Sequence, residues 1–132
     1  MTNPLAMKSA APHVLICDDD RQFSAEFAEA LTARGWAATA FLSMSALLTP
    51  TILVLDICMP EPDGIEILNM LSRHEHKERF KIVLVSGWDE RVMGMAASLC
   101  RVYGLRLLGT FSKPVSVRAL CDLLQADADE WD

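Results

Sequence analysis

The stretch that decides the fold is VLICDDD (Val14–Asp20), in which a short apolar run ends at three acidic residues. Two later runs share this design, ILVLD (Ile52–Asp56) and IVLVS (Ile82–Ser86), and a fourth (Leu107–Pro114) ends with a lysine and a proline. Short, uninterrupted Val, Ile and Leu runs are typical of strands that a parallel sheet buries on both faces. Because the carboxyl ends of parallel strands meet at one edge, we expect these polar residues to gather there.

Helical patterns separate these runs. Phe23, Phe27 and Leu31 recur at every fourth position and predict a helix that ends near Gly35. The other predicted elements are a strand at residues 36–42 and helices at residues 43–48, 65–73, 90–103 and from the cap Ser116 onward. Five β-α units of this kind predict an α/β fold with a doubly wound, five-stranded parallel sheet.

Length and composition exclude several classes of protein. A chain of 132 residues with 52% hydrophobic and 23% charged residues is suited to one domain with its own core. A net charge of −6 and a pI near 5.0 argue against direct nucleic-acid binding. No apolar stretch is long enough to span a membrane. The 4 cysteines are widely spaced and lack metal-binding spacing, which favours reduced thiols in a cytoplasmic protein.

The chain is expected to have three parts. Residues 1–12 are predicted to be a flexible leader, because they lack the order of charged and apolar residues of a signal peptide. Residues 13–126 carry the predicted domain. Residues 127–132 are acidic and lack periodicity, so we expect an acidic tail or the start of a linker there.

The ordered set of motifs resembles the receiver domain of bacterial response regulators. The set consists of Asp18-Asp19-Asp20, Asp56 followed by Met59-Pro60 and Asp63-Gly64, then Ser86-Gly87, then Lys113-Pro114. It runs from about His13 to Gln125, and the order of its pieces is more specific than any one piece. The resemblance implies a flavodoxin-like, CheY-like (βα)5 fold and a phosphoacceptor role in a two-component system.

The resemblance also implies roles for single residues. Asp56 would be the phosphoacceptor, acting as a covalent nucleophile toward phosphorus. Lys113 would neutralise phosphoryl oxygens, and Ser86 would donate a hydrogen bond to the attached group. Mg²⁺ would offset the repulsion between the carboxylate and the anionic donor, since it prefers carboxylate and water ligands. Its implied protein ligands are Asp19, Asp56, the backbone carbonyl of Cys58, and Asp18 through a water molecule.

The residues also allow plainer interpretations. Asp20 is better explained as a helix N-cap than as a metal ligand, and Asp63 with Gly64 as a turn. Asp18, Asp19 and Asp56 could be ordinary loop acids. However, three carboxylates that converge in one crevice would repel one another without a cation.

Four positions are expected to modulate the reaction. Many receivers carry Tyr or Phe three residues before the lysine, whereas this chain has Thr110 there, with Phe111 beside it. Cys58 and Trp88 would border the path of the water that attacks the phosphoryl group. Because neither side chain is suited to orienting that water, we predict slow self-dephosphorylation.

The family implies partners as well. A sensor histidine kinase or a phosphotransfer protein would supply the phosphoryl group, and the fourth helix and fifth strand would form a surface for output or for a homodimer. The segment Gly104–Gly109, followed by the lysine and proline, is similar to receivers fused to cyclic-di-GMP phosphodiesterase (EAL) domains. Such an output domain, fused or separate, is therefore a candidate partner.

Two other function classes stay open. One is a pseudo-receiver, an interaction module without phosphotransfer. The other is a phosphohydrolase, because Asp18-x-Asp20 after a strand is similar to haloacid-dehalogenase enzymes, although their nucleophile lies on the first strand. A receiver is not a conventional enzyme, since it would catalyse its own phosphorylation and slow dephosphorylation.

Overall fold

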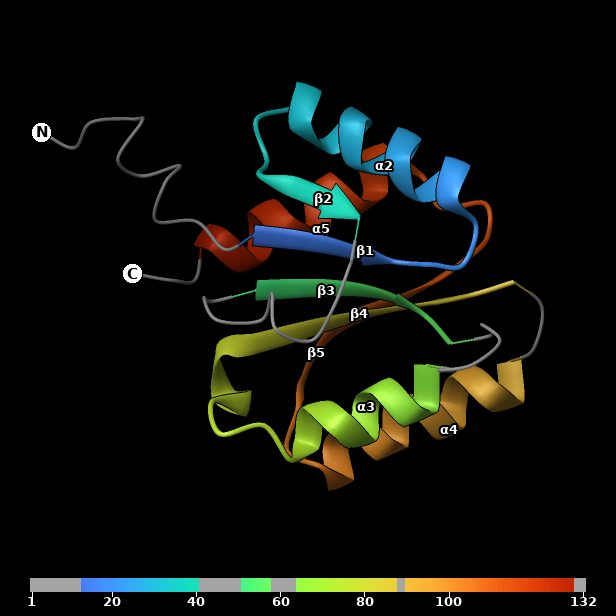
Figure 1. The fold of residues 1–132 in the computed structure, drawn as a ribbon, viewed down its shortest axis with the longest axis vertical. Helices are drawn as coiled ribbons and strands as arrows, with labels where there is room; N and C mark the ends of the chain where they lie inside the picture. Colours follow the sequence, from blue (N-terminus) through green and yellow to red (C-terminus); the bar gives the residue numbers. More distant parts are fainter. Residues whose placement is uncertain (1–12, 41–50, 58–63, 88–89, 130–132) are drawn as a thin grey trace, which may run out of the picture.

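A parallel sheet lies between two layers of helices in the computed structural model, which describes residues 13–40, 51–57, 64–87 and 90–129 (Figure 1). The sheet has five strands in the order β2-β1-β3-β4-β5. Every neighbouring pair is parallel. The strands are β1 (His13–Cys17), β2 (Ala38–Ala40), β3 (Thr51–Asp56), β4 (Phe80–Ser86) and β5 (Arg106–Ser112). The predicted doubly wound, five-stranded α/β fold is confirmed.

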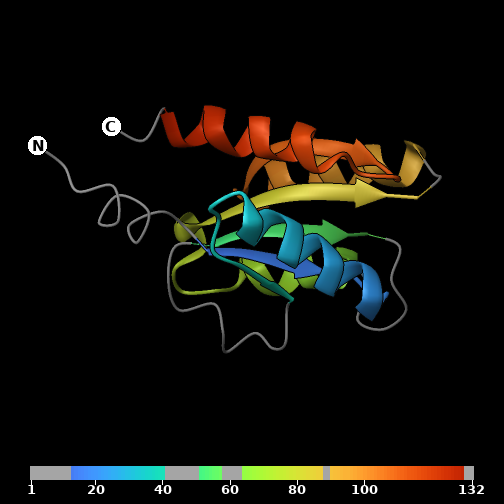
Figure 2. The same cartoon turned by 90° about the horizontal axis from the view of Figure 1, so that it is seen from above.

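In the described part of the chain, two helices cover each face of the sheet. The helices are α2 (Arg21–Ala33) and α5 (Val117–Asp129) on one face and α3 (Gly64–Ser72) and α4 (Glu90–Val102) on the other, with a short 3₁₀ turn, η2 (Lys77–Arg79), before β4. In Figure 2, α2 and α5 lie on the near side of the strands, and the arrowheads of β1, β3 and β4 all point the same way. The carboxyl ends of the strands therefore form one edge of the molecule.

Strand residues alternate between these two layers. In β1, Val14 and Ile16 pack with α2 and α5, whereas Leu15 and Cys17 pack with α3 and α4. The central strands β3 and β4 are buried along their whole apolar runs, because helices cover both faces. This double burial is the physical reason for the uninterrupted Val, Ile and Leu runs in the sequence.

The boundaries of α2 agree with the sequence prediction. The Asp20 carboxylate accepts a hydrogen bond of 3.0 Å from the backbone N–H of Phe23 and thereby caps the helix. At the other end, Gly35 has a φ of 93°, and the N–H of Trp36 donates to the carbonyl of Leu31 at 3.1 Å. This left-handed glycine ends the helix as a Schellman motif.

The last helix is longer than expected. It continues to Asp129, so residues 127–129 are helical where the lack of periodicity predicts a tail. Asp127 is 6% exposed, and its Oδ2 lies 2.7 Å from Lys81 Nζ in β4. A search for apolar periodicity misses a helical turn that is held by a buried ion pair.

Strand β5 contains a β-bulge that changes which face its side chains meet. Ile82 pairs with Leu107, but the next residue, Val83, pairs with Gly109. Regular alternation would place Leu108 and Phe111 on opposite faces, yet both pack with the α2 and α5 layer. The extra residue thus turns Phe111 toward α5 and leaves Thr110 exposed on the opposite side.

Other expected elements lie outside the described residues, namely the leader at 1–12, the helix at 43–48 and the end of the chain at 130–132. Strand β2 is shorter than the predicted strand at 36–42, whose last two residues are also outside that part. Among the helices described here, none combines the length and apolar character that crossing a membrane requires.

Candidate phosphoacceptor and metal site

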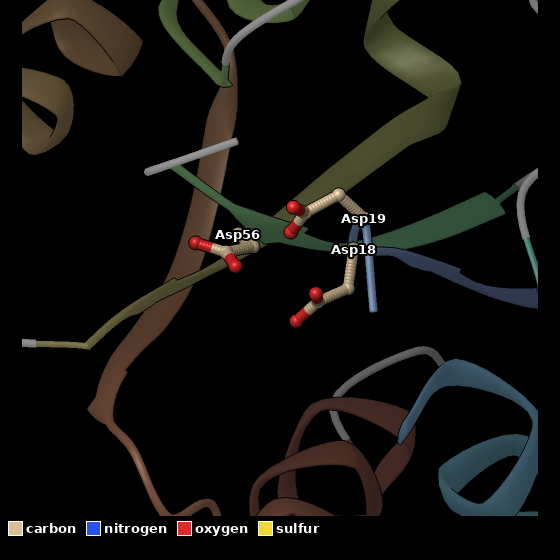
Figure 3. A group of neighbouring side chains, drawn as sticks. All are labelled: Asp18, Asp19 and Asp56. Atoms are coloured by element: carbon tan, nitrogen blue, oxygen red, sulfur yellow. The ribbon is translucent and has the colours of Figure 1, made fainter. Parts of the chain in front are cut away.

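Three carboxylates meet at the carboxyl ends of two adjacent strands (Figure 3). Asp18 and Asp19 follow β1, and Asp56 is the last residue of β3. One oxygen from each carboxylate lies within 4.8 Å of the other two. The side chains of Asp18 and Asp56 are only 3% and 5% exposed, whereas Asp19 is open to solvent. The structure therefore brings together the three acids that the strand ends singled out.

Backbone contacts hold the acidic segment after β1 in place. Asp18 Oδ1 accepts a hydrogen bond of 2.9 Å from the N–H of Asp20, and Ser24 Oγ donates to the Asp18 carbonyl at 3.2 Å. Asp20 itself caps α2, in agreement with the plainer interpretation of that residue. Asp18 and Asp19 therefore belong to the carboxylate cluster, whereas Asp20 caps the helix.

Lys113 lies between two of the carboxylates. Its Nζ is 2.9 Å from Asp18 Oδ2 and 2.9 Å from Asp56 Oδ2. Burial alone would lower the pKa of the ammonium, but the hydrogen bonds and charges of Asp56 and Asp18 outweigh burial and raise it above the ordinary value. Lys113 is therefore a fixed positive charge at neutral pH.

The end of β4 positions both Ser86 and Lys113. Asp56 pairs with Val85 across the sheet, so Ser86 lies one residue beyond Asp56 on the neighbouring strand. The backbone N–H of Lys113 donates to the Ser86 carbonyl at 2.9 Å. Ser86 is 4% exposed, at the same edge as the carboxylates. The ends of three strands and the turn after β5 therefore bring the predicted acids, serine and lysine to one edge of the sheet.

Gly64 explains how α3 starts so close to this edge. A Cβ atom at Gly64 would lie 2.4 Å from the Ile57 Cα and 3.0 Å from the Asp56 carbonyl oxygen. No side chain fits at that distance, so glycine is needed for the close approach of the helix to the end of β3. The sequence predicts a turn at this position and does not reveal the contact.

Cys17 lies directly before the acidic segment but is no nucleophile. It is 5% exposed and packs in the core beneath the carboxylates. Burial, and then the negative charges of Asp18 and Asp56, raise the pKa of its thiol to about 12. The thiol therefore stays protonated and adds no charge to the site.

One residue of the site was not expected from the sequence. The Phe23 ring lies under Lys113, with 5.3 Å between its centroid and Nζ. The sequence shows Phe23 only as part of a helical stripe. Its position three residues after the cap Asp20 is the signal that places it in the first turn of α2, beside the strand ends.

The expected modulators divide into two groups. Thr110 is exposed and Phe111 packs on the α5 side, so the two side chains lie on different sides of β5. Cys58 and Trp88 lie outside the described residues, so the predictions that rest on them receive no geometry.

The donor set fits a small, hard divalent cation. Carboxylate oxygens are the ligands that Mg²⁺ prefers, and here three acids offer them within 4.8 Å. Lys113 brings a single positive charge to these three acids. Two negative charges are left over at a crowded edge, which a divalent cation would balance.

A family model described as the response regulator receiver domain matches residues 14–125. No curated protein sequence matches the chain.

Solved structures share the fold. A response regulator from Colwellia psychrerythraea is 30% identical, with 89% of this chain and 97% of that chain covered and a TM-score of 0.71. A signal receiver domain from Bermanella marisrubri is 23% identical, with 88% and 97% covered and a TM-score of 0.71. A response regulator protein from Burkholderia pseudomallei is 19% identical, with 90% and 69% covered and a TM-score of 0.66. With its family match over almost the whole chain and its acidic cluster at the strand ends, this chain belongs to the response regulator receiver domains.

Proposed function

We propose that this receiver domain accepts a phosphoryl group on Asp56 from a histidine kinase or a phosphotransfer protein, in a Mg²⁺-dependent reaction, and thereby switches a partner surface. The observation that carries the proposal is the position of the Lys113 ammonium, 2.9 Å from Asp18 and from Asp56, beside the exposed Asp19. A nucleophilic carboxylate next to a fixed cation and further acids is the arrangement that phosphoryl transfer to aspartate requires.

The transfer is an exchange of one bond to phosphorus. An oxygen of Asp56 forms the new P–O bond while the P–N bond of the donor phosphohistidine breaks, and the donor imidazole leaves. Lys113 neutralises the phosphoryl oxygens during the transfer, because its Nζ already contacts the carboxylate that attacks the phosphorus. Ser86 lies on β4, one residue beyond the partner of Asp56, and its hydroxyl group donates a hydrogen bond to the attached phosphoryl group.

Asp19, Asp56 and the backbone carbonyl of Cys58 are proposed to hold the cation directly, and Asp18 through a water molecule. When bound, Mg²⁺ supplies positive charge that reduces repulsion between the carboxylate and the anionic donor. Both carboxylate oxygens of Asp18 already have partners, because Oδ2 contacts Lys113 and Oδ1 accepts a hydrogen bond from the N–H of Asp20, and this fits an indirect role for Asp18. The Burkholderia pseudomallei relative is described with a phosphorylated aspartic acid and a calcium ion, which is compatible with both parts of the proposal.

The partners follow from the same proposal. Phosphorylation is expected to alter the surface of α4 and β5, for output or for a homodimer, in a cytoplasmic signalling protein. Because Phe111 packs toward α5, we assign the movement to α4 rather than to a swinging ring. An EAL-type phosphodiesterase, fused or separate, is the proposed output.

Intact-protein mass spectrometry with acetyl phosphate and Mg²⁺ tests the function, followed by mapping of the modified residue. The proposal expects a phosphorylated species at Asp56 that requires Mg²⁺ and is absent from Asp56→Asn. The matched control is Asp20→Asn, which keeps a capping side chain and leaves the cluster intact. The absence of any adduct would indicate a pseudo-receiver, and rapid turnover with modification at Asp18 would indicate a phosphohydrolase.

A further inference from the structure

The Lys113 ammonium has a third neighbour besides the two carboxylates. Its Nζ lies 5.3 Å from the centroid of the Phe23 ring. A cation within about 6 Å of an aromatic face is attracted by the negative potential of that face. The lysine side chain is 32% exposed, so water screens this contact only in part.

The ring is held in place from two sides. The backbone N–H of Phe23 donates to the Asp20 cap, which sets the residue in the first turn of α2. The Phe23 ring also stacks on Phe27, with 5.3 Å between centroids and an angle of 26° between planes. Phe27 is 5% exposed and packs in the core, so it anchors the outer ring. The contact with Lys113 is therefore built into the start of the helix.

The ring differs from the carboxylates in what happens during the reaction. Asp56 and Asp18 attract the ammonium before phosphorylation, but in the proposed reaction Asp56 also binds the cation and the phosphoryl group, and Asp18 also holds a water molecule on the cation. The ring takes no part in either event, so its attraction for the ammonium persists when the carboxylates are engaged. A neutral partner of this kind keeps the long lysine side chain near the phosphoryl oxygens.

We infer that Phe23 is a positioning residue for Lys113, whose ring holds the ammonium in the site through a cation–π contact while the carboxylates bind other groups. The inference rests on the function proposed above. It also assigns a role to a side chain that sequence patterns place only in the apolar stripe of α2.

A series of fluorinated phenylalanines at position 23 tests the electrostatic part. Replacement of Phe23 by its 4-fluoro, 3,4-difluoro and 3,4,5-trifluoro analogues weakens the ring potential stepwise at nearly constant shape. The rate of Asp56 phosphorylation by acetyl phosphate, at saturating Mg²⁺, is expected to fall at each step. Phe23→Leu is expected to reduce the rate about two- to fivefold, as for a partly exposed cation–π pair.

Phe27 provides the matched control, because it is the stacked neighbour but faces the core. The same analogues at position 27 are expected to leave the rate unchanged. Equal rates across the series at position 23, or equal losses at positions 23 and 27, would overturn the inference.

A second measurement needs no phosphorylation. In NMR spectra the ε-methylene protons of Lys113 are expected to show an upfield ring-current shift that Phe23→Leu abolishes and that persists when Mg²⁺ is added. Loss of the shift on adding Mg²⁺ would overturn the inference even in a protein that phosphorylates normally. A persistent shift in a wild-type protein that never modifies Asp56 would instead overturn the proposed function alone.

Discussion

Lys113 Nζ and Asp56 Oδ2 lie 2.9 Å apart, although the two residues are 57 positions apart in the chain. The ammonium also contacts Asp18 at 2.9 Å, so one lysine joins the acids at the ends of β1 and β3. In this position it partly balances the charge of three acids that could hold a divalent cation. If the proposed cation binds there, its binding and the position of the lysine are expected to be coupled.

Replacing this lysine tests the coupling. In Lys113→Met the two carboxylates lose the ammonium, so we expect the metal-free free energy of unfolding to fall by about 1–3 kcal/mol. Mg²⁺ is expected to bind more tightly, because it no longer competes with the ammonium, and to restore much of the stability. Urea denaturation with and without Mg²⁺ measures both effects. Unchanged or weaker Mg²⁺ binding in the variant would contradict the competition.

Asp19 is a proposed metal ligand, and its neighbour Asp20, which caps α2, provides a matched control. Asp19→Asn removes a charged ligand and is expected to weaken Mg²⁺ binding by at least about tenfold, or about 1.4 kcal/mol, and to abolish phosphorylation. Asp20→Asn keeps the cap of α2 and is expected to retain the affinity. Isothermal titration calorimetry compares the two. Wild-type affinity in Asp19→Asn would remove Asp19 from the ligand set.

Ser86 is predicted to act after the transfer rather than in it. Ser86→Ala is expected to accept a phosphoryl group on Asp56 but to lose the activated conformation, since the hydroxyl contact forms only with the phosphorylated state. Amide exchange with and without the phosphate mimic beryllofluoride reports the conformation. We expect the mimic to change protection in α4 of the wild type and not in the variant. Identical protection in both states of the wild type would mean that this switch is absent.

The ion pair of Lys81 with Asp127 is predicted to hold the last turns of α5. Their side chains are 11% and 5% exposed, so Lys81→Met leaves a buried carboxylate without its closest cation and is expected to cost about 3–5 kcal/mol of unfolding free energy. Adding Asp127→Leu is expected to recover most of that loss. Arg106→Ala serves as the control, with a small effect, because Arg106 is 55% exposed and 3.5 Å away. Equal losses in the single and double variants would show that packing, rather than charge, dominates.

Alkaline pH is predicted to destabilise the fold partly through Cys100. Burial in α4 raises the pKa of its thiol from 9.0 to about 11. Between these two values the unfolded chain has lost the proton that the folded chain retains, so stability falls as pH rises, by up to about 1.4 kcal/mol per pH unit. Cys100→Ala is expected to show a shallower decline in urea titrations over this range. Parallel declines in both proteins would exclude the thiol as a cause.

Much of the fold and of the site could be predicted because the signals are local. The apolar runs before Asp18, Asp56 and Ser86 identify buried strands, and parallel strands bring their carboxyl ends to one edge. The caps Asp20 and Ser116 and the stop at Gly35 are also local, since each acts on backbone groups within a few residues. These features can therefore be predicted without any knowledge of the tertiary fold.

Other features depend on contacts between distant segments. The segment from residue 127, where a tail is expected, is helical up to Asp129, and a lysine in β4 pairs with Asp127 there. The bulge in β5 depends on the register with β4 and decides the side on which Phe111 packs. The residue pattern within α5 or within β5 does not predict these pairings with β4.

The sequence by itself determined that the chain alternates buried strands with amphipathic helices and that its acids, serine and lysine follow strand ends, because burial and capping act over a few neighbouring residues. Only the tertiary structure decided that Lys113 lies between Asp18 and Asp56 and over the Phe23 ring. Those distances depend on strand register and on the start of α2, and are therefore set by packing across the whole sheet.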